Sequence, residues 1–267
     1  MFRAGLDKEG VVANEKGDAL TALKSAAKVV GADYEVPYLA HASMEPMNCT
    51  AQVTPERADL WLGTQNPEGA LTAAAELLGV APDNVYVHTC FLGGGFGRRF
   101  YNDDVKQAVT IAKAMAGKPV KMIWTREEDM RHDFYRPMAA IRFRAGLDAN
   151  GVPVAYLNRS VTHSILSWVR PDAVKNGIDS SSVEGLANTP YAFGQYRIEH
   201  LIQNTPVPVG FWRSVGGSQN AFAIESFMDE LAYATGKDPV EFRRMLLKDR
   251  ADWLLVLDTM AQKANWG

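Results

Sequence analysis

The sequence predicts an α+β fold, in which mixed α/β segments are combined with antiparallel hairpins. Residues 85–91 alternate in the manner of a strand and lead into the glycine run 93–97. A helical apolar stripe and a further β-like segment at 120–125 follow, which gives strand, glycine loop, helix and strand in succession. Later, Asp148–Gly151 is a hairpin turn signal between two strand-like segments. The mixture is closer to α+β than to a doubly wound sheet.

The elements before the glycine run begin with a helix at 18–30. Asp18 is its expected N-cap, apolar residues repeat at helical spacing, and Gly31 is expected to end it. The other elements expected here are, in order, an extended segment at 34–36, a loop at 41–48, a strand at 58–62 and a helix at 70–78 that ends at Gly79.

After the glycine run, Asn102 or Asp103 is expected to cap a helix whose stripe extends to Ala116 and which ends at Gly117. The remaining elements expected are, in order, strands at 120–125, 139–145 and 152–161, a loop-like stretch at 164–193, a helix capped by Ser218 and ended by Gly236, and a helix opened by Asp238-Pro239. Three regions are therefore expected: a helical lead-in at 1–32, a first α/β unit at 33–133 and a second at 134–267.

Composition excludes several classes of protein. The 267 residues carry 28 Lys and Arg against 31 Asp and Glu, which argues against a general nucleic-acid binder. Two cysteines, Cys49 and Cys90, cannot hold an iron–sulfur cluster by themselves. No apolar run is long enough to span a membrane, and no signal peptide is visible in the first 25 residues, which leaves localisation open between cytoplasm and periplasm.

The glycine run is the strongest candidate for a binding loop. Glycines 93–95 and 97 allow a close approach of backbone to a ligand, although a tight turn without a ligand explains them about equally well. Arg98 stands where a dinucleotide-binding GxGxxG motif needs glycine, and no Gly-Lys-Ser/Thr follows as in a P-loop.

Three further candidates have simpler explanations beside the functional one. Arg213 precedes Ser214 and a glycine pair, where it can face a substrate or form a structural salt bridge. Gln65 can donate to a cofactor from a loop. Glu225 and Asp229 share a helical face and can mimic an acid/base pair, although solvated surface is the commoner case. A hydrolase of the G-x-S-x-G type is excluded because the motif is absent.

Several segments, taken in order, resemble the molybdenum hydroxylase family, which includes xanthine dehydrogenase and aldehyde oxidase, and most of all the large (beta) subunits of its isoquinoline-oxidising members. The resemblance spans nearly the whole chain. The strings that carry it are Tyr38-Leu-Ala-His-Ala-Ser-Met-Glu-Pro-Met-Asn-Cys-Thr50, Gly63-Thr-Gln-Asn-Pro67, Leu92-Gly-Gly-Gly-Phe-Gly-Arg-Arg99, Phe211-Trp-Arg-Ser-Val-Gly-Gly-Ser-Gln-Asn-Ala-Phe222 and Asp238-Pro-Val-Glu-Phe-Arg-Arg244.

The resemblance implies a molybdopterin-binding domain of the aldehyde oxidase/xanthine dehydrogenase type, and roles for particular residues. Residues Gly94, Gly95, Phe96 and Gly97 would lie beside the molybdenum oxo group and the pterin. Gln65 would hydrogen-bond that oxo group, and Arg213 would face the substrate as a catalytic residue. Arg243 would lie near the cofactor, although a slip of one residue would put Arg244 there instead. No metal ligand comes from the chain.

The sequence departs from the family in two ways. Where purine-oxidising members have a substrate-contacting glutamate, this chain has Phe100, so the resemblance favours an N-heteroaromatic, isoquinoline-like substrate or an aldehyde. The family's glutamate base lies on a glycine-rich motif that this chain lacks. We therefore expect an incomplete domain, a fragment that is inactive by itself. Glu45 and the pair Asp103–Asp104 are expected to be structural.

The resemblance also implies partners. The cofactor would be molybdopterin in a dinucleotide form, and water would supply the oxygen. Electrons would leave through [2Fe–2S] clusters on a small iron–sulfur (alpha) subunit. The alternative to an oxidoreductase is a folded cofactor-binding fragment without activity.

Overall fold

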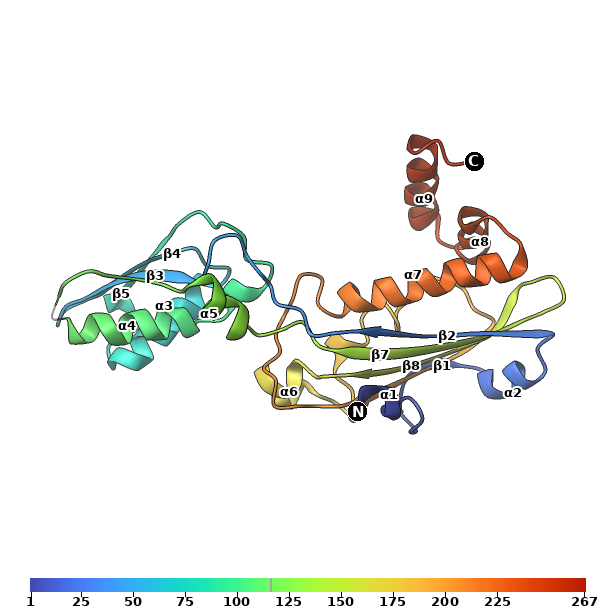
Figure 1. Cartoon of the computed structure of the whole chain (residues 1–267), viewed down its shortest axis with the longest axis horizontal. Coiled ribbons are helices and arrows are strands. Elements are labelled where there is room, and N and C mark those ends of the chain that lie inside the picture. Colours follow the sequence, from blue (N-terminus) through green and yellow to red (C-terminus); the bar gives the residue numbers. More distant parts are fainter. Residues whose placement is uncertain (116) are drawn as a thin grey trace. The chain divides into compact units, whose positions relative to one another are not determined.

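The computed structural model describes residues 1–115 and 117–267, which form two compact units built from discontinuous segments (Figure 1). Unit 1 comprises Met1–Tyr38, Pro137–Pro206 and Ser214–Gly267, and unit 2 comprises Leu39–Arg136 and Val207–Arg213. This division differs from the expected regions 1–32, 33–133 and 134–267. The N-terminal residues do not stand apart because their strands pair with strands formed by residues 139–202.

Unit 1 is organised around a five-stranded sheet of order β1-β9-β8-β7-β2. Its strands are β1 (Val11–Lys16), β2 (Lys28–Val36), β7 (Ala139–Leu147), β8 (Pro153–Thr162) and β9 (Gln195–Ile202). Strands β8 and β9 are parallel, and the other neighbours are antiparallel. The β7–β8 pair is the hairpin that the Asp148–Gly151 turn signal predicts, and Asp148 Oδ1 accepts hydrogen bonds from the N–H groups of Asn150 and Val152 at 2.8 Å each.

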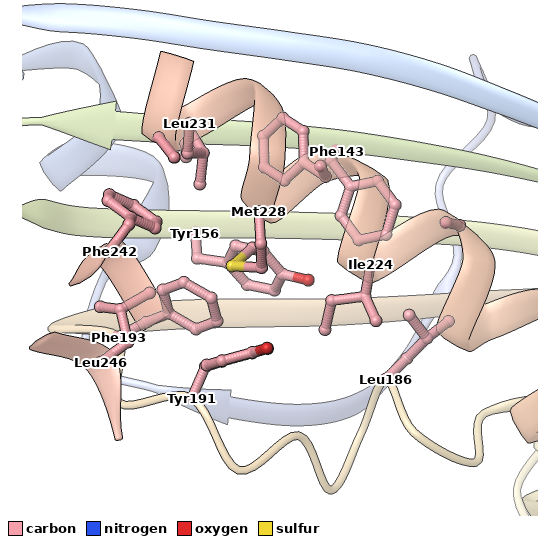
Figure 2. Packing of buried hydrophobic residues seen from close by; sticks show 14 of the residues in the cluster. Phe143, Tyr156, Leu186, Tyr191, Phe193, Ile224, Met228, Leu231, Phe242 and Leu246 are labelled. Atoms are coloured by element: carbon pink, nitrogen blue, oxygen red, sulfur yellow. The ribbon is translucent and has the colours of Figure 1, made fainter. Parts of the chain in front are cut away.

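The main core of unit 1 lies between this sheet and α7 (Gly216–Thr235), with α8 (Pro239–Leu246) packed at one end (Figure 2). Phe143 stacks on Phe227 with ring centroids 5.0 Å apart, and Tyr156 stacks on Phe193 at 3.9 Å. The remaining helices of unit 1 are α1 (Phe2–Gly5), α2 (Ala19–Lys24), α6 (Leu166–Val169) and α9 (Ala251–Lys263), with 3-10 turns η3 (Pro171–Ala173) and η4 (Ser180–Ser182).

Unit 2 has a four-stranded sheet of order β5-β4-β3-β6, with two helices on one face. The strands are β3 (Asn48–Val53), β4 (Ala58–Leu62), β5 (Val85–Thr89) and β6 (Val120–Ile123). The helices are α3 (Pro67–Leu78), α4 (Asp103–Ala114) and α5 (Arg126–Arg131), with 3-10 turns η1 (Pro82–Asn84) and η2 (Arg98–Phe100). The buried residues of α3 are all alanines, and α4 buries Ala108 and Ala112 beside Val105 and Val109. These small side chains let both helices approach the sheet closely.

Several expected elements are confirmed with their termini. The expected strand 58–62 is β4, and the expected sequence of strand, glycine loop, helix and strand is β5, residues 92–99, α4 and β6. Helix α3 begins after Asn66, whose side chain accepts from the Gly69 N–H, and ends at Gly79 in the left-handed conformation. Helix α8 begins after Asp238, which accepts from two backbone N–H groups.

Other expectations were wrong. The helix expected at 18–30 ends at Lys24, because residues 28–36 form β2 and pair along its whole length with β7. Ser218 does not cap α7, which already begins at Gly216. The helix expected to reach residue 116 ends at Ala114, and residue 116 itself lies outside the described residues. The stretch 164–193 contains α6, η3 and η4 rather than loop alone. No helix within residues 1–115 and 117–267 has the length and apolarity needed to cross a bilayer.

Candidate functional site

Two of the five sequence strings lie wholly within unit 2, together with parts of two others. These are the segment after Leu39, the turn Gly63–Pro67, the glycine loop 92–99 and the segment up to Arg213. Direct hydrogen bonds join them: Glu45 N–H donates to Gly93 O at 3.1 Å, and Gln65 N–H donates to Arg99 O at 2.9 Å. The fifth string, with Arg243, lies on α8 in unit 1.

The backbone of the glycine loop is strongly curved. Gly94, Phe96 and Gly97 have φ values of 97°, 56° and 107°, and the non-glycine residue among them is unusual in that region. No acceptor among the described residues of unit 2 receives a hydrogen bond from the N–H groups of Gly94, Gly95 or Phe96. Successive N–H groups in such a curve form a concavity that binds oxygen acceptors.

Gln65 lies at the base of this loop and is oriented by it. Its Oε1 accepts a hydrogen bond from the Gly97 N–H at 3.0 Å. A Cβ atom on Gly95 would lie 2.5 Å from the same Oε1, so the absence of a side chain at Gly95 leaves room for the Gln65 amide. The contact fixes which end of the amide faces the loop, and no acceptor among the described residues of unit 2 takes a hydrogen bond from the Gln65 Nε2 group, which is therefore available to donate to a ligand.

Arg99 holds the glycine loop from behind. Its buried guanidinium donates to Gly94 O and to Glu45 O, each at 2.9 Å, and to Glu45 Oε2 at 3.0 Å. Burial alone would raise the pKa of Glu45, but hydrogen bonds from Gly93 N–H and Asn48, together with the charge of Arg99, hold that pKa below its ordinary value. Glu45 is therefore an ionised structural anchor, in agreement with its expected role.

A second buried arginine, Arg98, connects the loop to a charged network that sequence reasoning missed. Arg98 donates to both carboxylate oxygens of Asp103 at 2.8 and 2.7 Å. Its Nε lies 3.2 Å from Asp133 Oδ1, an ion pair without the angle of a hydrogen bond. Asp133 in turn contacts His41 Nδ1 at 2.9 Å. Asp103 is thus structural, as expected, but through Arg98.

Asp104, the other acid in the first turn of α4, is 2% exposed. Burial, reinforced by the neighbouring charge of Asp103, raises the pKa of Asp104 to about 7. Burial disfavours the charged form, so this carboxyl takes up a proton at a far higher pH than an ordinary aspartate does.

Two aromatic side chains border the loop on its accessible side. Phe96 and Phe100 are 39% and 41% exposed. The ring of Phe100 meets the ring of Phe211 edge to face, with centroids 5.9 Å apart. The position that the resemblance gives to a substrate-contacting residue is thus an apolar, accessible ring.

Arg213 is exposed, and it makes no ion pair or hydrogen bond with the described residues of unit 2. Its neighbour Trp212 packs under Arg136 instead, with the Arg136 guanidinium carbon 5.9 Å from the ring centroid. The next residues, Ser214 and Val215, have φ values of 68° and 48°. A β-branched residue with positive φ is a backbone outlier, and such outliers concentrate at functional segments.

Arg243 is engaged by acidic residues of its own unit. Its guanidinium donates to Glu225 Oε2 at 2.9 Å and to Asp229 Oδ1 at 2.6 Å. Glu225 also accepts from the Tyr191 hydroxyl at 2.9 Å. Glu225 and Asp229, the two carboxylates that could mimic an acid/base pair, therefore neutralise an arginine in this structure.

The site in unit 2 can thus bind a group rich in oxygen acceptors. The glycines of the loop carry no side chains, which leaves the space beside the loop backbone open to such a group. The N–H groups of residues 94–96 and the Gln65 amide nitrogen are donors without acceptors among the residues that the structure describes in unit 2. The accessible rings Phe96 and Phe100 suit a flat partner. A pterin carrying an oxo-metal group has both properties, so the residues present fit such a cofactor. Among the residues described, no cluster of His, Cys, Asp or Glu could hold a metal ion directly.

Comparison with known families gives one match across most of the chain. Residues 6–247 match the model of the molybdopterin cofactor-binding domain. The chain is 30% identical over 276 aligned residues to isoquinoline 1-oxidoreductase subunit beta of Brevundimonas diminuta, covering 100% of this chain and 35% of that protein. It is 29% identical to the aldehyde oxidoreductase molybdenum-binding subunit of Escherichia coli strain K12, covering 85% of this chain and 30% of that protein.

Among solved structures, quinoline 2-oxidoreductase from Pseudomonas putida 86 matches with a TM-score of 0.74 at 21% identity. The match covers 97% of this chain and 35% of that one, and it confirms the fold. The chain spans about a third of the length of these relatives.

Proposed function

The chain belongs to the molybdopterin cofactor-binding domain family, and from that premise we propose that it is the cofactor-cradling part of a molybdenum-dependent hydroxylase. The proposed activity is hydroxylation of an N-heteroaromatic, isoquinoline-like compound or an aldehyde, with water as the oxygen source. The observation that carries the proposal is the set of free N–H groups at Gly94, Gly95 and Phe96 beside the oriented Gln65 amide.

In the proposed assignment, these loop residues and Gly97 bind the cofactor, in a dinucleotide form, through backbone N–H groups and through Gln65. When bound, the cofactor supplies a two-electron oxidation of an electron-poor carbon. Phe100 borders the substrate pocket, and its apolar ring supports an aromatic or aldehyde substrate over a purine. Arg243 remains a proposed cofactor neighbour. Its ion pairs with Glu225 and Asp229 hold the guanidinium in place, so it would act as a fixed positive charge.

The experiment that tests the proposal is metal and pterin analysis of the purified protein. We expect molybdenum and pterin in equal amounts. We expect both to be lost together in a variant of the glycine loop whose N–H donors can no longer reach the cofactor. A protein that folds but never retains pterin under conditions that load a known member of the family would contradict the proposal.

The second candidate function is a cofactor-binding piece without activity. One observation favours it: three carboxylates near the glycine loop in unit 2 are already committed, Glu45 to Arg99, Asp103 to Arg98 and Asp133 to His41. A fourth, Asp104, is buried within the unit. A general base must be free to accept a proton within hydrogen-bond reach of the reacting group. In the same experiment, the loaded 267-residue chain is offered isoquinoline and aldehydes with a dye acceptor. Turnover that depends on molybdenum would exclude this candidate.

Arg213 is proposed to stabilise negative charge that develops on the substrate. Its guanidinium has no hydrogen-bond or ion-pair partner among the described residues of its own unit, and the two residues after it have positive φ values, a feature that is common at functional segments. Arg213→Met in the active enzyme should lower kcat/KM by about 2–4 kcal/mol of barrier, the typical loss for one preorganised donor. Steady-state kinetics with an N-heteroaromatic substrate and with an aldehyde measure this loss of kcat/KM. Unchanged kcat/KM with lower thermal stability would make Arg213 a structural residue.

Electron transfer is proposed to need a separate small iron–sulfur subunit carrying [2Fe–2S] clusters. The chain has a buried Cys49 and an exposed Cys90, whereas such a cluster needs four ligands. The name of the Brevundimonas relative, subunit beta, supports a multi-subunit enzyme. We expect the native protein to co-purify with an iron-containing polypeptide. A native preparation that is active and free of iron would contradict this.

A further inference from the structure

His41 has acceptors facing both of its ring nitrogens. Nδ1 lies 2.9 Å from Asp133 Oδ1 and 3.1 Å from Oδ2, and Nε2 lies 3.1 Å from the backbone carbonyl oxygen of Phe211. A carboxylate and a carbonyl only accept hydrogen bonds, so each ring nitrogen must carry a hydrogen for both contacts to be hydrogen bonds. The neutral ring carries one hydrogen and would leave two acceptor atoms facing each other in a buried position.

The surrounding charges favour a positive ring. The side chains of His41 and Asp133 are 1% and 2% exposed, and Arg98 is 1% exposed. In the order His41, Asp133, Arg98, Asp103, the charges of the network alternate when the imidazole is protonated. A neutral imidazole would leave this buried chain with a net negative charge, which is costly away from water.

Other ionisable groups adjoin the same network. The buried Asp129 of α5 and Asp104 of α4 face Arg98, as does the hydroxyl of Tyr101. Burial raises the pKa of both carboxyls and raises that of Tyr101 to about 12. Carboxyl and phenol groups are neutral or negative in either protonation state, so none of the three supplies a positive charge to balance Asp133.

The same contacts join the two loops of the site. The Phe211 carbonyl receives the His41 contact, and the Phe211 N–H donates to the Tyr101 hydroxyl at 3.0 Å. Phe211 is therefore held at both backbone groups by residues outside its own segment, two positions before Arg213. On the other side, Asp133 and Arg98 connect His41 to the glycine loop.

We propose that His41 is a positioning residue that acts as a doubly protonated imidazole and fixes the Arg213 segment against the glycine loop. The proposal rests on the proposed function for its purpose, but its geometry stands within unit 2 without any cofactor. Neither His41 nor Asp133 needs to touch substrate in this role.

The first test is nitrogen-15 NMR of the histidine side chains in the whole chain at pH 7. We expect His41 to show two protonated ring nitrogens, with its signals assigned by their loss in His41→Gln. A neutral His41 ring would overturn the proposal, and the protonation state itself is measured on the unsubstituted chain.

The second test is hydrogen exchange of the backbone amides at 209–213. His41→Phe keeps the ring volume and removes both donors, and it should speed exchange there by roughly tenfold or more, since a hydrogen bond to a charged group is lost. His132→Phe is the matched control, because His132 lies in the same unit with its side chain 63% exposed. Equal exchange at 209–213 in the two variants would overturn the proposal.

Neither readout uses the cofactor or turnover. A doubly protonated His41 in a protein that never retains pterin would leave this inference standing and remove the proposed function. Pterin retention with a neutral His41 would do the reverse.

Discussion

Replacing Gly97 with alanine is expected to separate the two loops of the site and to lower kcat/KM by about 100-fold, as misplacement by an ångström commonly does. A Cβ atom on Gly97 would lie 1.6 Å from the carbonyl oxygen of Phe211 and 2.8 Å from its carbon. The obstacle is backbone, so it cannot rotate away. The φ of 107° at Gly97 adds strain for any L-residue with a side chain.

The consequences should appear in binding as well as in rate. The Gly97 N–H donates to Gln65 Oε1, so a shift at this residue also releases the Gln65 amide. We expect pterin and molybdenum content to fall sharply in Gly97→Ala, measured after purification of the folded protein. Because the Phe211 carbonyl also receives the His41 contact, the hydrogen-exchange rate of the backbone amides at 209–213 should rise as well.

Gly79→Ala is the matched control for this prediction. Gly79 also has a positive φ, 73°, but an added Cβ would meet nothing within 4 Å. Alanine there should cost about 1 kcal/mol of stability from left-handed backbone alone, without loss of cofactor. Equal cofactor content in the two variants would contradict the prediction and would mean that the glycine loop does not form the binding surface.

Replacing Arg99 with methionine is expected to lower the free energy of unfolding by about 1–3 kcal/mol, the usual cost of leaving buried hydrogen-bond acceptors without a donor. The Arg99 side chain is 0% exposed, and it donates to the Gly94 and Glu45 carbonyls as well as to the Glu45 carboxylate. Methionine fills most of the volume but leaves these acceptors without donors. Urea unfolding monitored by tryptophan fluorescence measures the loss.

Two comparisons sharpen this result. Arg57→Met removes an exposed arginine that pairs with Asp59 on a strand of the same unit, and it should leave the unfolding midpoint unchanged. Arg99→Lys keeps the charge but lacks the planar fork that reaches several oxygens, so its stability should lie between those of the wild type and Arg99→Met. An Arg99→Met protein as stable as Arg57→Met would show that the loop is held by other contacts.

The sequence predicted the parts of the fold that local chemistry determines. Asn66, Pro67 and Gly79 mark the termini of α3, and the Asp148–Gly151 turn joins β7 to β8. The error at 18–30 has a tertiary cause: the spacing of Leu20 and Leu23 is helical, but residues 28–36 pair with β7, which lies more than a hundred residues later in the chain. No local pattern reports a partner at that distance.

The sequence identified some residues of the candidate site and missed others. Gln65 and the glycines were found because unusual backbone leaves a mark in the sequence, and the structure brings them into contact. Arg99 stood out only as part of the glycine-loop string, and its role depends on the carbonyl of Gly94 in its own loop and on carbonyls supplied by two other segments. His41 gave no signal, since a lone histidine acquires its two acceptors only after folding.

The order in which the chain is made bears on how unit 1 can form. Strand β2 ends at Val36 and its partner β7 begins at Ala139, so about 100 residues must leave the ribosome between them, about 5–20 s of synthesis. The two ends of the intervening segment, Leu39 and Arg136, pair backbone to backbone, with the Arg136 N–H donating to Leu39 O at 2.9 Å. Once residues 39–136 have folded, β2 and β7 meet across a short closure rather than a long one, which reduces the entropy cost of their pairing by about 3 kcal/mol. The paired ends of this segment therefore favour formation of the β2–β7 pair before the rest of the sheet has been synthesised.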